Sequence, residues 1–302
     1  MLKRVLRWSG IVLGVVLLAA GGFVYAQASA FDASLDKVYD VQVTGIAVSS
    51  DPAVVARGKH LAESLGGCTA CHGADLGGLP GEQMGPLGQF HGSNLTSGKG
   101  GIGKHYSDAQ LARVIRHGVK ADGKTLRFMP AQDFSWWPDT ELIALVSYLR
   151  SVPPVDRTMP EGHVGVLGKV LDRLDKFVMD VARRIDHHAA RPSVPEPAPT
   201  PQYGRYLALL CTGCHGPHLG GGKIPGAPPE LPIPSNITPH ETGIKAYTEA
   251  DFIALLNTGI KRDGKKLDPF MPVAALAAMN DVEKKALWAY LRAVPPRPFG
   301  SR

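Results

Sequence analysis

Cysteine and aromatic residues are scarce in this chain, and strand-like sequence is scarcer still. Of its 302 residues only four are cysteine, and aromatic side chains make up 7%. No stretch alternates apolar and polar residues as a half-buried strand does, which argues against an all-β fold. With so few aromatics, each half of the chain, at roughly 100 residues, is expected to hold only a modest polypeptide core.

Charge of one sign is not concentrated anywhere either. The formal net charge is +6, but the lysines and arginines are scattered along the chain. A nucleic-acid-binding surface requires a basic cluster, so the composition does not indicate nucleic acid as a partner.

All four cysteines lie in two CxxCH motifs. The residues are Cys68, Cys71, His72, Cys211, Cys214 and His215. This motif attaches c-type haem: the two thiols add across the porphyrin vinyl groups, and the histidine supplies an imidazole to the iron. The sequence therefore predicts two covalently attached haem c groups and leaves no thiol for disulfides or nucleophilic catalysis. A four-thiolate zinc site is the alternative, and it would require the two distant motifs to converge.

Each motif sits inside a longer pattern that occurs twice. CTACHGADLGG at 68–78 matches CTGCHGPHLGG at 211–221. YSDAQLARVIRHGVKADGKTLRFMP at 106–130 matches YTEADFIALLNTGIKRDGKKLDPFMP at 247–272. The offset between the copies is nearly constant, which indicates one domain copied in tandem.

Five segments follow from this repeat and its flanks. They are an N-terminal membrane anchor or signal segment at 1–30, a tether at 31–50, domain one at 51–154, a helical and Pro-rich linker at 155–201, and domain two at 202–298. Local signals predict helices inside the domains. Asp51-Pro52 begins one helix, and Ser107 with Gln110 forms a capping box for another that stops at Gly118. Long Gly- and Pro-rich loops separate the helices.

Each half resembles a class I cytochrome c domain. The matching pieces are an N-terminal helix with Gly58 or Gly204, the CxxCH motif, a downstream Met-Pro, and a C-terminal helix containing Tyr-Leu-Arg at 148–150 or 290–292. The resemblance implies an all-α fold of two tandem class I cytochrome c domains with haem-wrapping loops. The tandem arrangement is similar to membrane-anchored cytochrome c subunits of periplasmic alcohol and gluconate dehydrogenases, which usually carry three haem domains where this chain has two.

An electron-carrying haem needs a second axial ligand besides the histidine. Met129 and Met271 each occur as Phe-Met-Pro at the same repeat position, where the class I fold carries its distal methionine. The prediction is that His72 and Met129 bind one iron and His215 and Met271 the other. A core-filling role, which is usual for methionine, is the alternative.

Loop residues around each haem are expected to be structural. A backbone carbonyl should accept the Nδ1–H of each CxxCH histidine and fix its ring, and loop position suggests Pro80 or Pro86 in domain one and Pro225 in domain two. Asn94 and Asn236 each begin an Asn-x-Thr triplet at equivalent places, which predicts a repeated turn rather than a glycosylation site.

The N-terminus combines a basic leader with an uncharged run. Lys3, Arg4 and Arg7 precede the apolar stretch 8–25, which at about 18 residues is just long enough to span a bilayer. The prediction is one transmembrane helix with the haem domains in the bacterial periplasm. Ala-x-Ala sequences at 26–30 leave open a cleaved signal peptide and a soluble periplasmic protein.

The segment between the domains predicts an amphipathic helix followed by a stiff Pro-rich spacer. Apolar residues recur at helical spacing: Leu167, Val170, Leu171, Leu174, Phe177, Val178, Val181 and Ile185. Two interpretations are open. The helix either packs against the haem domains and orients them, or it is a docking face for a partner subunit or the membrane surface.

These observations predict a dihaem c-type cytochrome that relays single electrons and is not itself an enzyme. Its partners would be redox proteins, either free or within a dehydrogenase or oxidase complex on the outer face of the membrane. The alternative is a dihaem cytochrome c peroxidase-like enzyme, whose reactive haem must leave one iron position open to peroxide. Such an enzyme would have one electron-carrying haem and one reactive haem. Because Phe-Met-Pro is present in both halves, the sequence argues against this difference between the two haems.

Overall fold

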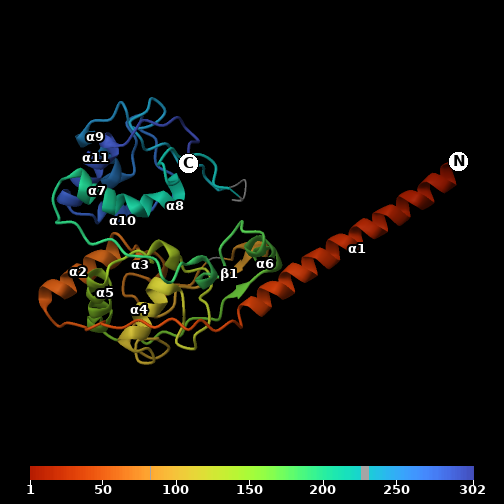
Figure 1. Ribbon diagram of the computed structural model, residues 1–302, viewed down its shortest axis with the longest axis horizontal. Helices are drawn as coiled ribbons and strands as arrows, with labels where there is room; N and C mark the ends of the chain where they lie inside the picture. Colours follow the sequence, from red (N-terminus) through yellow and green to blue (C-terminus); the bar gives the residue numbers. More distant parts are fainter. Residues whose placement is uncertain (82, 226–230) are drawn as a thin grey trace.

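Helices supply almost all the regular structure in the computed structural model, which describes residues 1–81, 83–225 and 231–302. Two lobes lie against each other, and a long helix leaves the molecule at one end (Figure 1). The first lobe contains α2 (Pro52–Glu63), α3 (Cys68–His72), η1 (Gly85–Leu87), α4 (Asp108–His117), η2 (Ala131–Asp133) and α5 (Asp139–Ser151). The second contains α7 (Pro201–Ala208), η4 (Leu209–Cys211), α8 (Thr212–His215), α9 (Glu249–Thr258), α10 (Val273–Ala277) and α11 (Asp281–Ala293).

Strands are almost missing from the described residues. Two antiparallel strands of two residues each, β1 (Gly88–Gln89) and β2 (His163–Val164), pair a loop of domain one with the linker. The prediction of an all-α fold is confirmed.

Helix boundaries follow the predicted caps. The Asp51 side chain accepts the Ala53 N–H at 2.8 Å at the start of α2, and Ser107 and Gln110 form a complete capping box at the start of α4. The α4 helix ends at Gly118, which has φ +63°. A side chain is disfavoured in this left-handed conformation, which explains why glycine stands there.

One glycine in each domain allows the first and last helices to cross at close range. A Cβ on Gly58 of α2 would lie 1.9 Å from the carbonyl oxygen of Ala144 in α5. A Cβ on Gly204 of α7 would lie 1.9 Å from the carbonyl oxygen of Ala286 in α11. Both distances are far below van der Waals contact, so only glycine permits this packing. The two copies therefore share a helix crossing as well as a sequence pattern.

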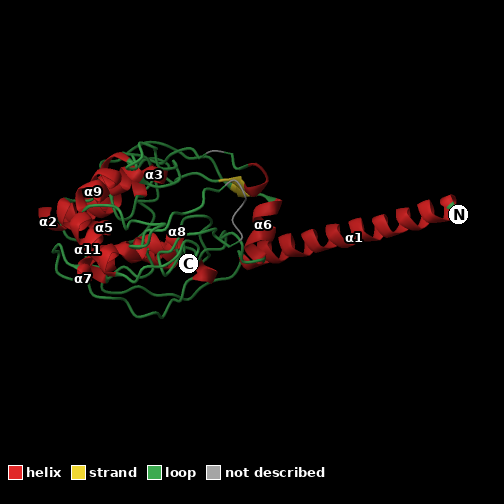
Figure 2. Ribbon diagram, turned by 90° about the horizontal axis from the view of Figure 1, so that it is seen from above, coloured by secondary structure: helices red, strands yellow, loops and turns green. Residues whose placement is uncertain are grey.

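The N-terminal helix α1 (Leu2–Ser34) is longer than the predicted anchor and continues into the predicted tether. It points away from both lobes in two perpendicular views (Figures 1 and 2). By length and composition it is the one helix among the described residues that could cross a membrane. Its last turn is anchored, because Phe31 is fully buried against Val164 and Met179 and Asp32 pairs with Lys169 at 2.6 Å.

The linker differs from its prediction. Its helix α6 covers only Val166–Arg173, so the prediction of one helix through residue 185 was wrong. The buried Asp172 side chain accepts the N–H groups of Met179 and Asp180 at 2.9 and 3.1 Å, which turns the chain back on itself. The α6 helix packs against α1, and the returning segment with η3 (Ala182–Arg184) lies on domain one.

Candidate haem sites

The two CxxCH motifs adopt the same local structure. The first forms α3, and the second spans the end of η4 and α8. Each is followed by a glycine with positive φ and, three residues later, by a buried leucine that also has positive φ, +54° at Leu76 and +60° at Leu219. Left-handed backbone is costly for leucine, so its repetition marks a loop whose shape is fixed by the surrounding packing.

Each CxxCH histidine is held by one carbonyl. The Nδ1 atom of His72 lies 2.7 Å from the Ser93 oxygen, and that of His215 lies 2.7 Å from the Ser235 oxygen. A carbonyl can only accept, so Nδ1 carries the proton and Nε2 keeps the lone pair that binds a metal. Burial lowers the pKa of both rings, which favours the neutral form that ligates.

The predicted carbonyl partners were therefore wrong. Pro80, Pro86 and Pro225 were suggested by loop position, whereas the acceptors are the residues directly before the two Asn-x-Thr triplets. The reason is tertiary: those triplets form rigid turns that bring the serine carbonyls alongside the histidines.

The Asn-x-Thr turns are built identically. Asn94 and Asn236 are 1% and 3% exposed. In each, Oδ1 accepts the N–H and the hydroxyl of the following threonine at 2.9 and 2.8 Å. The Nδ2 group donates to a carbonyl beyond the last helix of the domain, Val155 or Arg297, at 2.7 Å. The prediction of a repeated structural turn is confirmed.

Both candidate methionine ligands lie on equivalent loops. Met129 and Met271 are half-buried, and each is followed by a proline with nearly the same backbone angles, φ −79° and ψ 59° at Pro130 and φ −76° and ψ 64° at Pro272. Met129 also packs against the main hydrophobic cluster. The loops thus present one thioether per domain in the same local geometry.

The thiols are suited to covalent attachment and do not gather at one point. Burial raises the pKa of Cys68 and Cys211 to about 12 and also raises those of Cys71 and Cys214, so all four thiols are neutral at pH 7. A four-thiolate zinc site requires the sulfur atoms of both motifs to converge. Across the described ranges, no three Cys, His, Asp or Glu side chains form a group that could hold a metal ion. One thioether-bound haem in each domain fits these residues.

Each haem-attachment loop faces the other domain. A Cβ on Gly67, beside Cys68, would lie 3.9 Å from the Ala275 side chain in α10. A Cβ on Gly213, between the domain-two cysteines, would lie 3.6 Å from Oδ1 of Asp133 in η2. Asp133 and Ala275 occupy equivalent positions after the two methionines. The contact is therefore reciprocal and brings both attachment loops to the domain interface.

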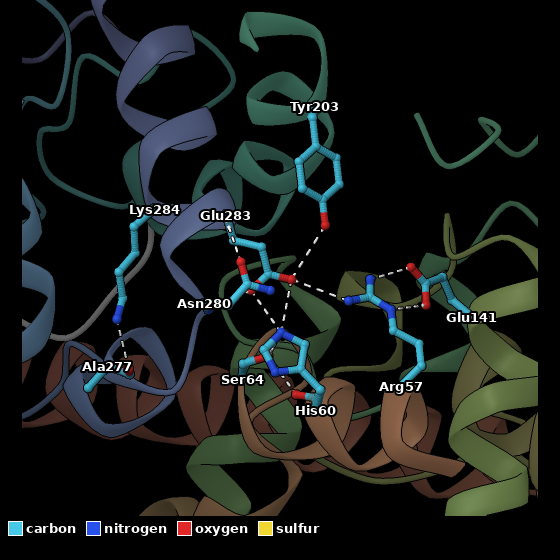
Figure 3. A network of polar contacts seen from close by, with 9 residues as sticks. All are labelled: Arg57, His60, Ser64, Glu141, Tyr203, Ala277, Asn280, Glu283 and Lys284. Carbon is cyan, nitrogen blue, oxygen red and sulfur yellow. Dashed lines mark hydrogen bonds and ion pairs between the residues drawn. The ribbon is translucent and has the colours of Figure 1, made fainter. Parts of the chain in front are cut away.

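A buried ionic network joins the two domains (Figure 3). Glu283 of α11 is fully buried and accepts from His60 at 2.8 Å, Arg57 at 3.2 Å and Tyr203 at 3.4 Å. Arg57 also pairs with Glu141 at 2.5 Å. Burial by itself would raise the pKa of Glu283, but the hydrogen bond and charge of His60 and the charge of Arg57 hold it below its usual value.

This network has a two-fold character that the sequence analysis missed. Glu141 and Glu283 occupy the same repeat position, and so do Arg57 and Tyr203, which directly precede the crossing glycines. Apolar packing adds to it, since the rings of Trp136 and Tyr206 meet edge to face with centroids 5.2 Å apart. The sequence feature that could have indicated this network is the glutamate in the first turn of the last helix of each domain.

Comparison with known families matches both halves. The family described as cytochrome c oxidase, cbb3-type, subunit III matches residues 53–149, and the family described as cytochrome c matches residues 203–295. The chain therefore contains two cytochrome c domains and carries two covalently bound haem c groups.

Curated relatives extend the likeness beyond single domains. The fructose dehydrogenase cytochrome subunit of Gluconobacter japonicus is 27% identical over 268 residues, covering 80% of this chain and 53% of the relative. The alcohol dehydrogenase (quinone) cytochrome c subunit of Gluconacetobacter polyoxogenes is 27% identical over 278 residues, covering 82% and 58%. The gluconate 2-dehydrogenase cytochrome c subunit of Pantoea cypripedii is 37% identical over 94 residues, covering 29% and 21%. The chain is homologous to such dehydrogenase cytochrome subunits and spans about half the length of the first two.

Proposed function

We propose that this protein is an electron-transfer subunit that relays single electrons through two haems, with His72 and Met129 as axial ligands of one iron and His215 and Met271 as those of the other. The reciprocal contact between the attachment loops carries this proposal, because it sets the two cofactors on either side of one interface. The relatives named above are cytochrome subunits of dehydrogenases, which favours a carrier and does not favour a peroxidase.

When bound, each haem supplies a one-electron iron couple, and the chain supplies its environment. The serine carbonyls hold the histidine rings in one tautomer and orientation. Met129 and Met271 offer thioether sulfur, which raises a haem potential compared with a second imidazole. The prolines that follow them fix one backbone angle and so stiffen the loops that would hold the two sulfur atoms.

Placement in the membrane is the second part of the proposal. We infer that α1 crosses the cytoplasmic membrane once, with Lys3, Arg4 and Arg7 on the inner side and both domains in the periplasm. A dehydrogenase subunit on the same face would deliver the electrons, as the names of the relatives suggest. The mass of the mature chain tests this placement, because removal of the first 28 or 30 residues would show a cleaved signal peptide instead.

The far-red sulfur-to-iron absorption band of the oxidised protein tests the ligand assignment. Two equivalents of the band are expected, with one lost in Met129→Ala and one in Met271→Ala. Met84→Ala is the matched control, since Met84 is partly exposed and has no counterpart in domain two. A band that survives in either ligand variant, or a high-spin signal in the wild type, would contradict the assignment. Peroxide turnover by the wild type would restore the enzyme alternative.

A further inference from the structure

A hairpin precedes each candidate methionine and is closed by the same backbone contacts in both domains. Hairpin 1 covers residues 118–128 and hairpin 2 covers residues 259–270. In each, the N–H of the first lysine donates to the carbonyl of the lysine four residues later at 2.8 Å. A β-bridge links equivalent residues, Val119 with Thr125 and Ile260 with Lys266. How much of each hairpin is covered therefore depends on its side chains and on which other segments pack against it.

The tether covers one side of hairpin 1. The N–H of Tyr39 donates to the carbonyl of Gly123 at 2.9 Å, and Asp36 pairs with Lys124 at 2.7 Å. A Cβ on Gly123 would lie 2.9 Å from the Val38 side chain. These contacts cover Gly123 and one side of the tip of hairpin 1.

The linker covers the other side. The hydroxyl of Thr125 accepts the Ala182 N–H at 2.9 Å, and Thr125 is buried. Phe128 stacks on Phe90 with ring centroids 4.4 Å apart. Val119, on the inner strand of the hairpin, is 0% exposed. The inner strand of hairpin 1 is thus buried under its own chain, and Phe128 keeps 37% of its surface exposed against 55% at Phe270.

Hairpin 2 has no such cover. Ile260, the counterpart of the buried Val119, is 45% exposed, and Phe270 is 55% exposed. No described atom lies within 4 Å of a Cβ placed on Gly264. Lys266 stands in place of the buried Thr125 and is exposed. The sequence change at this position agrees with the difference in burial, because a lysine could not be buried as the threonine is without a charged partner.

Hairpin 2 is also basic. It carries Lys261, Arg262, Lys265 and Lys266 against two carboxylates, Asp263 and Asp268. Lys265 pairs with Asp263 at 3.2 Å and Arg262 with Asp251 at 3.4 Å. Lys261 and Lys266 form no ion pair with any residue that the structure describes. Exposed apolar side chains with surplus positive charge are the composition that docks an acidic partner transiently.

We propose that hairpin 2 is the docking surface at which a soluble, acidic redox protein exchanges one electron with the domain-two haem, whereas the domain-one haem is reached on this side only through its own chain. The inference rests on the proposed ligand role of Met271, which follows the hairpin directly. In the exchange, ferrous haem is oxidised to ferric and the partner's metal gains the electron, with no bond made or broken.

Hairpin 2 could instead contact membrane lipid, but its position relative to α1 argues against this. The α9 helix, which directly precedes hairpin 2, lies on the side of the two lobes away from α1 in both views (Figures 1 and 2). A membrane that contained α1 would therefore be remote from this surface. A diffusing protein has access to it.

Plastocyanin, an acidic blue-copper protein, serves as the probe. Stopped-flow kinetics would follow oxidation of the fully reduced, haem-loaded chain in detergent by excess cupric plastocyanin. Lys261→Gln with Lys266→Gln should lower the second-order rate constant about tenfold at low ionic strength and flatten its salt dependence, because two steering charges are lost. The matched control is Lys99→Gln with Lys120→Gln, which removes two charges from domain one, including the counterpart of Lys261, and should change the rate constant less than twofold.

Equal rate constants for the wild type and the hairpin-2 variant would overturn the docking surface, and so would an equal loss in the control. The far-red bands distinguish a wrong docking surface from a wrong ligand assignment. If only the docking surface is wrong, the wild type still shows both bands. Vesicles containing phosphatidylglycerol test the alternative of lipid contact. Loss of vesicle binding in the hairpin-2 variant with unchanged plastocyanin kinetics would assign the surface to lipid and reject the inference.

Discussion

Replacing Glu283 with alanine should loosen the contact between the two haem domains. The Glu283 carboxylate lies at the centre of the interface network and is fully buried. Its loss leaves His60 with Ser64, 3.3 Å away, as its remaining side-chain partner. Arg57 keeps its pair with Glu141. The substitution therefore removes the domain-two carboxylate that both Arg57 and His60 of domain one contact.

The magnitude follows from burial. Breaking a buried ion pair from one side costs about 3–5 kcal/mol, and we expect about 3 kcal/mol here because Arg57 retains Glu141. The matched control is Glu63→Ala. Glu63 pairs with Lys59 at 3.8 Å in an exposed i,i+4 contact on α2, and such pairs contribute about 0.3–0.5 kcal/mol.

Calorimetry of the haem-loaded protein measures the effect. The wild type should unfold with the two domains coupled, and Glu283→Ala should lower the transition temperature and separate two transitions. The same coupling should be lost in acid. The folded-state pKa of Glu283 lies below its usual value of 4.5, so its contribution is complete above pH 4.5 and disappears as the pH falls through the lower folded-state pKa.

A clear result would refute this reasoning. If Glu283→Ala changed the unfolding free energy by no more than Glu63→Ala, about 0.5 kcal/mol, the network would not hold the domains together. The apolar contact of Trp136 with Tyr206 would then account for the interface, and Tyr206→Ala would produce the uncoupling instead.

Two further predictions concern the interface and the helix crossings. Burial raises the pKa of Asp133 to about 6, so its ionisation beside Cys214 should lower the domain-two haem potential as pH rises through 6. The Coulomb interaction of one new negative charge with the iron puts the expected shift on the order of tens of millivolts. Redox titration should show this slope in the wild type and none in Asp133→Asn. Gly58→Ala and Gly204→Ala should each destabilise their own domain by about 1–3 kcal/mol or more through overpacking. Denaturant unfolding followed at each haem would contradict this if either variant matched the wild type.

Local chemistry determined much of this fold in advance. The haem motifs and the capping residues of α2 and α4 could be identified from the sequence because each depends on residues only a few positions apart. The tandem repeat could be identified because its two copies keep matching residues at a nearly constant offset. Asn94 and Asn236 belong to the same class, since an asparagine bonds the backbone two residues later whatever surrounds it. These features predicted the positions of both attachment loops.

Long-range contacts decided what the sequence alone could not. The linker helix ends early because Asp172 captures N–H groups that a continued helix would have used internally. The carbonyls that hold His72 and His215 come from residues about 20 positions away. Such partners depend on how loops fold back in space, and many loop residues fit the same spacing.

The asymmetry between the domains was seen only in the tertiary structure. Hairpins 1 and 2 share the pattern Gly-x-Lys-x-Asp-Gly-Lys, and both predict the same turn. Only the packing of the tether and linker shows that one is buried and the other exposed. The Glu283 network is likewise invisible locally, because it joins side chains more than 200 residues apart. Short-range hydrogen bonds are encoded by neighbours in the chain, whereas burial and charge pairing depend on which distant surfaces meet.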